Sequence, residues 1–215
     1  IDIIKRIASI KEININQINA DGNTVLHKET VLKNNELALL LIDFGADPTI
    51  LDKEGKSFLF YCISEGIKNI SVLQKVVLLG YDINSKNGQN KTLLMESINC
   101  YLHTPKDNVE IKNSHLEMIK ELIHLGINVN ALDNNNETLL FILVRHGNRE
   151  LLHLFLETNK MNLNYQNNQD ETPLLLMALN GIKNADLIKL FLEKGANPDL
   201  KNQMGKSIIE ILVDI

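Results

Sequence analysis

The sequence predicts an all-α fold, a solenoid of stacked helix-turn-helix units with projecting turns. Two observations support this fold class. A polar turn cluster followed by Thr or Ser and an apolar stretch recurs along nearly the whole chain. A second apolar stretch at helical spacing then follows and ends at a Gly-containing stop. Because two short helices cannot bury their own apolar face, such units must stack on their neighbours.

The recurring turn begins at an Asp or Asn. The first copy reads N-A-D-G-N-T-V-L-H over residues 19–27, and the leading polar residue returns at Asp52, Asn87, Asp133, Asn167 and Asn202. From Asn19 onward the spacings are 33, 35, 46, 34 and 35 residues. Four of the five lie close to one value, which indicates an array of repeats.

The second helix of each unit is expected to end in a left-handed residue, which Gly adopts without strain. The stop falls on Gly45, Gly80, Gly126 and Gly195. Asn159 takes this place in one unit, and the Gly of the polar turn is replaced by Asn90, Asn136 and Asp170. Asn and Asp tolerate a positive φ at modest cost, so the same geometry is expected there.

The order D-x-x-G-x-T-P-L-H, a short helix, then E-I-V-x-x-L-L-x-x-G-A-D-x-N is present in divergent form and resembles the ankyrin repeat. The resemblance implies one array over residues 1–215, and it implies that His27 braces its turn through a hydrogen bond. Its units would be a partial repeat at 1–18, full repeats at 19–51, 52–86, 87–132, 133–166 and 167–201, and a partial repeat at 202–215. The composition is similar to ankyrin proteins of intracellular bacteria or large DNA viruses, so a host-directed effector is one hypothesis.

The Leu that follows the Thr or Ser should point between the helices of adjacent units. These residues are Leu26, Leu59, Leu94, Leu140 and Leu174. The excess length of the third unit falls around residues 100–114 and predicts a polar, Pro-broken loop between two helices, either a tolerated insertion or a partner contact. Residues 207–215 predict a first helix without a second, which favours a chain that continues, with a makeshift cap as the alternative.

Composition argues against several classes of partner. The net charge of -5 and the scattered Lys and Arg residues argue against nucleic acid and anionic membranes. No apolar run approaches the roughly 20 residues that span a bilayer. Cys62 and Cys100 are too few for a disulfide framework, so we expect inert thiols in a cytoplasmic protein, in the host-cell cytosol if it is a secreted effector.

No constellation for catalysis is evident. The Gly-Lys-Ser tripeptides at 55–57 and 205–207 lie on the repeat's own turn, and the earlier Gly of a phosphate-binding loop is replaced by Ile50 and Leu200. No His or Cys has metal-ligand spacing, and no Ser or Cys lies in a nucleophile elbow. We therefore predict no catalytic residue, metal, cofactor or small-molecule substrate.

The resemblance implies a protein partner bound at the turn tips and at the ends of the first helices, which line a concave face. Carried over position by position, the partner-binding residues are Asp21, Asn23, Lys53, Glu54, Lys56, Glu65, Gln89, Lys91, Asn134, Asn135, Glu137, Arg145, His146, Gln169 and Glu171. Arg145 and His146 are the strongest candidates. Arg145→Glu is expected to weaken binding and to leave the melting curve intact.

The leading functional hypothesis is thus a non-enzymatic scaffold that binds a protein partner. Two alternatives are a substrate-recruiting region of a larger enzyme or effector, whose catalytic part lies outside this chain, and self-assembly through the apolar C-terminal end. The fold alone does not identify the partner.

Overall fold

The computed structural model describes residues 14–28, 33–65, 70–180 and 185–213. These residues form helices joined by long turns, which confirms the predicted all-α fold. Within them the extended pairing is limited to two isolated bridges, Leu51 with Ser57 and Lys86 with Thr92. The chain divides into two compact units, residues 1–127 and 128–215. One continuous array over the whole chain, with the repeat boundaries given above, stays a prediction.

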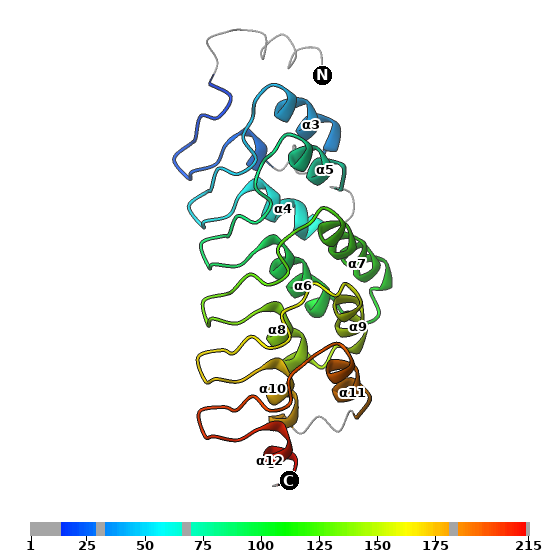
Figure 1. The fold of residues 1–215 in the computed structure, drawn as a ribbon. Coiled ribbons are helices and arrows are strands. Elements are labelled where there is room, and N and C mark those ends of the chain that lie inside the picture. Colours follow the sequence, from blue (N-terminus) through cyan, green and yellow to red (C-terminus); the bar gives the residue numbers. More distant parts are fainter. Residues whose placement is uncertain (1–13, 29–32, 66–69, 181–184, 214–215) are drawn as a thin grey trace. The chain divides into compact units, whose positions relative to one another are not determined.

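In the first unit, inner helices alternate along the chain with outer helices. The inner helices are η1 (Val25–His27), α4 (Phe58–Glu65) and α6 (Leu93–His103). The outer helices are α3 (Asn35–Asp43), α5 (Ile70–Leu78) and α7 (Val109–His124). Helix α4 packs between η1 and α6, α3 packs on α5, and α6 packs on α7. The long turns project from the inner helices on the side away from the outer ones (Figure 1).

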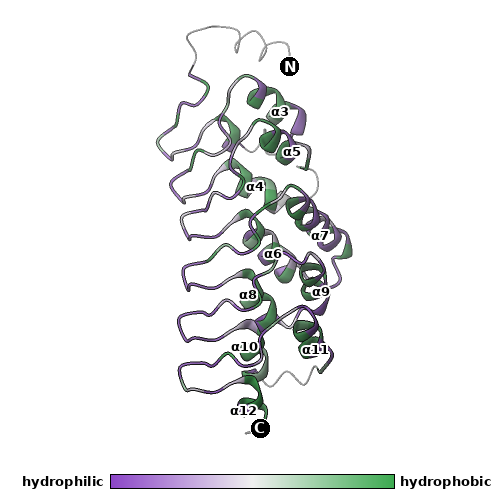
Figure 2. Ribbon diagram, viewed as in Figure 1, coloured by the Kyte–Doolittle hydropathy of each residue, from purple (hydrophilic) through white to green (hydrophobic). Residues whose placement is uncertain are grey.

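The second unit repeats this arrangement. Its inner helices are α8 (Leu139–His146), α10 (Pro173–Leu179) and α12 (Ile208–Val213), and its outer helices are α9 (Arg149–Glu157) and α11 (Ala185–Glu193). Helix α10 contacts α8, α11 and α12, and α8 contacts α9. The inner helices are strongly apolar, whereas the projecting turns are hydrophilic (Figure 2). Each helix pair therefore buries its apolar side against the neighbouring repeat.

Side-chain caps explain where many helices begin. The hydroxyl of Thr172 accepts a hydrogen bond from the N–H of Leu175 at 3.1 Å at the start of α10. The outer helices α3, α7 and α9 use Asn instead. Asn148 Oδ1 accepts from the N–H of Leu151 at 2.9 Å, and Asn34 does the same for α3. Each cap satisfies a backbone donor that has no partner inside its helix.

The residues predicted to point between repeats form the core. The exposed fraction is 1% or less for all five, Leu26, Leu59, Leu94, Leu140 and Leu174. The side chains of Phe58, Phe141, Phe155 and Phe191 are fully buried as well. This part of the prediction is confirmed, and it places the apolar core between stacked helices of each unit.

The residues that replace glycine adopt the expected backbone. Asn90, Asn136 and Asp170 have φ of 59°, 57° and 56° in the polar turns, and Asn159 has φ of 52° at the end of its outer helix. Gly45 and Gly195, in the same place as Asn159, have φ of 90° and 96°. The turn geometry is therefore kept without glycine, as predicted.

The excess length of the third repeat is divided between two longer helices and a short loop. Helices α6 and α7 have 11 and 16 residues, whereas α8 and α9 in the next repeat have 8 and 9. Only residues 104–108 connect α6 to α7. A polar loop that contains Pro105 does lie between the two helices, as expected, and most of the excess length around residues 100–114 is helical.

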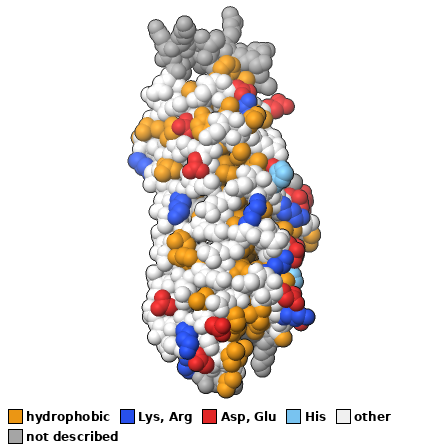
Figure 3. All heavy atoms as spheres, in the orientation of Figure 1, with side chains coloured by type: hydrophobic (Ala, Val, Ile, Leu, Met, Phe, Trp, Pro, Cys, Tyr) orange, Lys and Arg blue, Asp and Glu red, His pale blue; other side chains and the backbone are white. Residues whose placement is uncertain are grey.

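Helix α12 ends the described part of the second unit. Its Ile208 and Ile211 are buried, whereas Ile209, Leu212 and Val213 are 62%, 45% and 78% exposed. Figure 3 shows apolar side chains gathered at this end of the molecule. The counterparts of these exposed residues in α10, Leu174, Met177 and Ala178, are buried where α10 packs on α12.

Candidate protein-binding surface

Each projecting turn is built around the side chain of its leading Asp or Asn. The Oδ1 atom of Asp52 accepts hydrogen bonds from the N–H groups of Glu54 and Lys56, at 2.8 and 2.9 Å. The same two bonds, to the residues two and four positions later, are made by Asn19, Asn87, Asp133, Asn167 and Asn202. Six turns thus share one geometry, fixed by one oxygen.

Backbone hydrogen bonds join the tips of adjacent turns within a unit. In the first unit the N–H of Lys53 donates to the carbonyl of Asp21 at 3.1 Å, and the N–H of Gly88 donates to the carbonyl of Gly55 at 2.8 Å. In the second unit the N–H of Gln203 donates to the carbonyl of Gln169 at 3.2 Å. The tips are therefore held relative to their neighbours before any partner arrives.

Gly55 and Gly88 approach so closely that a side chain at Gly55 would clash with the backbone of Gly88. A Cβ at Gly55 would lie 2.5 Å from the Cα of Gly88, and the φ of Gly55 is 71°. This contact was not predicted from the sequence. The sequence carries little signal for it, because Gly55 is the fourth residue of its turn whereas Gly88 is the second residue of the next turn.

A second ladder of side chains connects the bases of the turns. In the second unit, Asn130 donates through Nδ2 to the carbonyl of Lys160 at 2.8 Å and accepts at Oδ1 from the N–H of Asn162 at 2.7 Å. Asn164 makes the same pair of bonds to Gly195 and Asn197 in the next repeat. Asparagine suits this place because one amide supplies both a donor and an acceptor.

Most predicted contact residues lie on or beside the tips. The exposed ones are Asp21, Lys53, Glu54, Gln89, Asn134, Asn135, Arg145, His146 and Gln169, and the partly buried ones are Asn23, Lys56, Lys91 and Glu171. Glu65 ends α4, and its side chain lies outside the described part of the structure. Glu137 is buried, contrary to the exposed position expected for it.

In the first unit the tips carry paired charges of both signs. Lys56 Nζ lies 2.9 Å from Glu54 Oε2, and Lys53 Nζ lies 4.0 Å from Asp21 Oδ1. The Glu54 hydrogen bond raises the pKa of Lys56. These pairs are exposed, so they add little to stability but leave both charges available to a partner.

Behind these tips, His27 braces the next turn as the resemblance implied. Its Nδ1 accepts from the N–H and hydroxyl of Thr24 at 3.1 and 3.0 Å, and its Nε2 lies 3.3 Å from the carbonyl of Lys56. Because a carbonyl only accepts, Nε2 carries the proton. Burial lowers the pKa of His27, against smaller opposing effects of the Lys56 carbonyl and Asp52. The neutral ring is thus the form that the fold uses.

Tyr61 completes the same cluster. Its hydroxyl donates to Oδ2 of Asp52 at 2.6 Å, and its ring meets the His27 ring edge to face at a centroid distance of 5.8 Å. Burial raises the pKa of Tyr61, and the hydrogen bond to Asp52 acts in the same direction. The cluster has no unsatisfied reactive group, which is the pattern of a structural brace.

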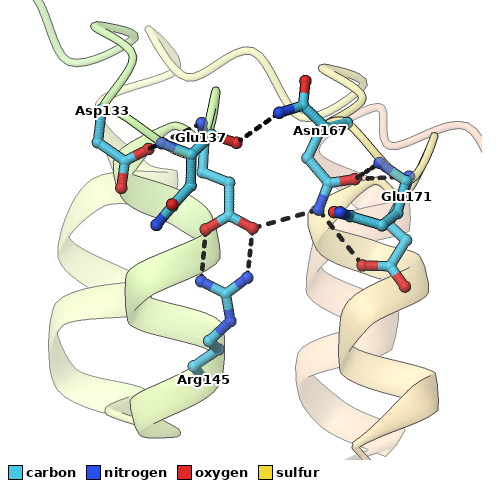
Figure 4. A network of polar contacts seen from close by, with 8 residues as sticks. Asp133, Glu137, Arg145, Asn167 and Glu171 are labelled. Carbon is cyan, nitrogen blue, oxygen red and sulfur yellow. Dashed lines mark hydrogen bonds and ion pairs between the residues drawn. The ribbon is translucent and has the colours of Figure 1, made fainter.

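In the second unit one turn holds an ion pair whose carboxylate is buried. Both terminal nitrogens of Arg145, at the end of α8, donate to the two carboxylate oxygens of Glu137 (Figure 4). The Glu137 side chain is 3% exposed and that of Arg145 is 45% exposed. The hydrogen bonds to Glu137 raise the pKa of Arg145. Burial of Glu137 is therefore possible because its charge is neutralised inside the repeat.

Asn167 links this ion pair to the next turn. Its Nδ2 lies 3.2 Å from Oε1 of Glu137 and 3.3 Å from Oε2 of Glu171, so one amide contacts two carboxylates from consecutive repeats (Figure 4). Glu171 lies in the same place in its turn as Glu137 does in the preceding one. The structure thus brings together three of the predicted contact residues, Glu137, Arg145 and Glu171.

This network revises the expectation for Arg145→Glu. Removing the guanidinium leaves the buried Glu137 carboxylate without its counter-ion, and a second carboxylate adds repulsion. The substitution should therefore destabilise the unit, so it cannot separate binding from folding. Sequence reasoning missed the pair because Glu137 and Arg145 are eight residues apart across a turn and a helix.

The two thiols do not have the surroundings of reactive cysteines. Cys62 is buried, and burial raises the pKa of Cys100 to about 11, so its thiolate is scarce at neutral pH. Within the described residues no group of three or more His, Cys, Asp or Glu is placed to hold a metal ion. No helix in the described ranges combines the length and apolar character needed to cross a bilayer.

Known proteins share this sequence pattern and fold. Residues 108–202 match the family model for ankyrin repeats, in three copies. Protein L371 of Acanthamoeba polyphaga mimivirus, an ankyrin repeat protein, is 27% identical over 184 residues, which cover 85% of this chain. The chain spans 21% of that protein's own length.

Two solved structures have the same fold. The ankyrin repeat domain of Bcl-3, a member of the IκB protein family, superposes with a TM-score of 0.75 at 18% identity, covering 98% of this chain and 85% of that domain. A chain in the complex of Bd0816, a predatory endopeptidase of Bdellovibrio bacteriovorus, with immunity protein Bd3460 superposes with a TM-score of 0.61 at 20% identity. This match covers 92% of the present chain and 93% of the other.

Proposed function

Because the chain belongs to the ankyrin repeat family, we propose that it is a non-enzymatic scaffold that binds a partner protein on the concave face formed by its turn tips and inner helix ends. The observation that carries the proposal is that each unit presents tips with exposed polar side chains, such as Lys53 and Gln89 in the first unit and Asn135 and Gln169 in the second. Ankyrin repeats are a general protein interaction module.

The physical basis is preorganisation. Ordering a flexible loop on binding opposes association, and a loop already held in place avoids most of that loss. Here each turn is fixed by the oxygen of its leading Asp or Asn, and adjacent tips share backbone hydrogen bonds. The affinity of the surface then depends mainly on which side chains the fixed tips present.

The composition of the tips favours a protein over a phosphate backbone. The first unit presents Lys53 beside Asp21 and Lys56 beside Glu54, and the second presents amides at Asn134, Asn135 and Gln169. A mixed-sign and amide-rich surface matches the polar rim of a protein interface. The complex with an immunity protein, in which a chain of the same fold occurs, agrees with a role in protein binding.

A second candidate function is recruitment of a substrate to a catalytic region elsewhere in a larger protein. One observation favours it, since the chain spans 21% of the length of the mimivirus relative. Both functions use the same surface. They differ in whether the captured protein is chemically altered by the full-length polypeptide, which mass spectrometry of the captured protein would reveal.

The proposal is tested by capture with two double variants of the second unit. Asn135→Arg with Gln169→Arg changes the tips, and His153→Arg with Glu193→Arg places two arginines on the exposed outer helices. A partner enriched from cell extract by the unmodified chain should be retained by the outer-helix variant and lost by the tip variant. Both variants should melt like the parent chain. Loss of the partner with the outer-helix variant alone would show that the partner binds the outer helices, which contradicts the proposal.

A further inference from the structure

Two consecutive turns of the second unit carry a Glu at the same position. Glu137 and Glu171 each precede the Thr that begins an inner helix, Thr138 and Thr172. Each also donates its backbone N–H to the leading residue of its turn at 3.0 Å. Since the two turns share one backbone geometry, the surroundings of one carboxylate are a direct reference for the other.

In the first of these turns the carboxylate is occupied by a guanidinium. Arg145, eight residues after Glu137 at the end of α8, donates to both of its oxygens. The place therefore suits a planar cation that approaches along the surface from the end of the inner helix. A bidentate arrangement of this kind is characteristic of Arg with a carboxylate.

In the second turn the equivalent place lacks the cation. The residue eight positions after Glu171 is Leu179, at the end of α10, and its side chain is 38% exposed. The Glu171 carboxylate accepts one hydrogen bond, from Asn167 Nδ2 at 3.3 Å. Arg145 interacts with Glu171 electrostatically, but both of its terminal nitrogens are hydrogen-bonded to Glu137, and no ion pair between described residues includes Glu171.

From this comparison we infer that Glu171 binds an arginine side chain of the partner, with the guanidinium on the carboxylate and the aliphatic stem over Leu179. The inference rests on the proposed function and specifies part of it. The partner segment that reaches the second unit carries an exposed Arg, and the guanidinium occupies at Glu171 the place that Arg145 occupies at Glu137.

The surroundings favour Arg over Lys. Asn167 Nδ2 contacts both Glu137 and Glu171 and so orients the second carboxylate before binding. A guanidinium matches an oriented carboxylate with two parallel hydrogen bonds, whereas an ammonium offers a compact, more strongly hydrated charge. The exposed Leu179 also suits the flat apolar stem of Arg.

The test is a selection of random 12-residue peptides displayed on phage against the 215-residue chain. Peptides retained by the parent chain should be enriched in Arg at one position. Their affinity should fall roughly ten-fold or more for Glu171→Gln. It should stay unchanged for Glu193→Gln, which removes an exposed carboxylate from outer helix α11.

A second pair of variants tests the proposed position of the guanidinium beside Glu171. Leu179→Arg places a guanidinium in the position that Arg145 holds for Glu137, so it should occupy Glu171 within the chain and abolish binding of the Arg peptides. Leu179→Met keeps an apolar side chain and should retain binding. Because Leu179 is exposed, neither variant should lower the melting temperature.

The outcomes separate this inference from the proposed function. Retained peptides without Arg, Lys-containing peptides that bind equally well, or binding insensitive to Glu171→Gln and Leu179→Arg would each overturn the assignment. If such peptides are still lost with Asn135→Arg and Gln169→Arg, binding at the tips stands. If no peptide is retained, or if those tip changes have no effect either, the proposed function falls as well.

Discussion

The Nε2 atom of His27 lies 3.3 Å from the carbonyl oxygen of Lys56, so a side chain in one repeat supports the turn of the next. Nδ1 of the same ring is bonded to Thr24, and the ring is 9% exposed. The contact ties two repeats of the first unit together through one neutral imidazole.

His27→Ala should therefore destabilise the first unit by about 1–3 kcal/mol, because it removes hydrogen bonds at both ring nitrogens and leaves buried partners unsatisfied. Urea unfolding followed by circular dichroism measures this change. His124→Gln is the matched control, since His124 is exposed at the end of α7. Equal unfolding midpoints for the two variants would contradict a bracing role for His27.

His115 in α7 should make stability depend on pH. It is 5% exposed, its Nδ1 has no hydrogen-bond partner, and burial lowers its pKa below 6.5. Stability is therefore fully present above about pH 6.5. It falls as the pH drops through 6.5 toward the folded-state pKa, because only the unfolded chain takes up the proton there.

His115→Leu should flatten this dependence, since it removes the titrating group and an unsatisfied buried nitrogen. Some slope should remain because the pKa of His27 is lowered in the same direction. Unfolding free energies measured at several values between pH 7.5 and 5 provide the comparison with the parent chain and with His124→Gln. An unchanged slope would show that His115 does not titrate across this range.

The ion pair in the second unit predicts a non-additive pair of substitutions. Arg145→Ala should lower the free energy of unfolding by about 1–3 kcal/mol, because it leaves the buried Glu137 charge unpaired. This range is smaller than for a fully buried pair, because the Arg145 side chain is partly exposed. Glu137→Gln combined with Arg145→Ala should be less damaging than Arg145→Ala alone. A double-mutant cycle in urea measures the coupling, and additive effects would mean that the pair does not compensate the burial of Glu137.

Leu140→Ala should destabilise the second unit by about 2–5 kcal/mol, because it leaves a cavity where Leu140 is 0% exposed. Leu78→Ala removes the same atoms from a side chain that is 81% exposed. Its effect should be close to zero. Melting curves of the two variants compare a buried with an exposed leucine. Similar shifts in melting temperature would show that Leu140 does not lie in the core.

Gly55→Ala should be more destabilising than Gly205→Ala. Both glycines have φ of 71°, so the backbone strain of the new side chain is the same. At Gly55 the added Cβ would also meet the Gly88 backbone at 2.5 Å, whereas nothing described lies within 4 Å of it at Gly205. Equal losses of unfolding free energy would show that the two tips separate easily.

The features that could be predicted from the sequence are those that repeat. Asn19, Asp52 and their counterparts recur at spacings of 33–35 residues, apart from one longer interval. The Oδ1 oxygen of each accepts the hydrogen bonds that hold its turn. Asn136 and Asp170 were expected to take over a glycine conformation, which their positive φ confirms. Periodicity compares each residue with its counterparts, so local geometry and core positions follow from it.

The features that occur once were missed. The ion pair of Glu137 with Arg145 has no counterpart among the described residues of the other repeats, and it depends on how two long side chains meet across a turn. The lengths of α6 and α7 were not predicted either, because the sequence located the excess around residues 100–114 without dividing it between helix and loop. Contacts between non-equivalent residues require the folded geometry.

One oxygen of the leading residue suffices to shape each turn, which leaves the second terminal atom of that side chain to vary. In Asp52 this atom is an oxygen, and it accepts from the Tyr61 hydroxyl. In Asn167 it is a nitrogen, and it donates to Glu137 and Glu171. Exchange of Asp for Asn at this position therefore changes the charge of a single turn by one unit and replaces a hydrogen-bond acceptor by a donor. The backbone path of the turn stays the same. Recognition in such a chain is free to diversify one turn at a time without refolding the frame that presents it.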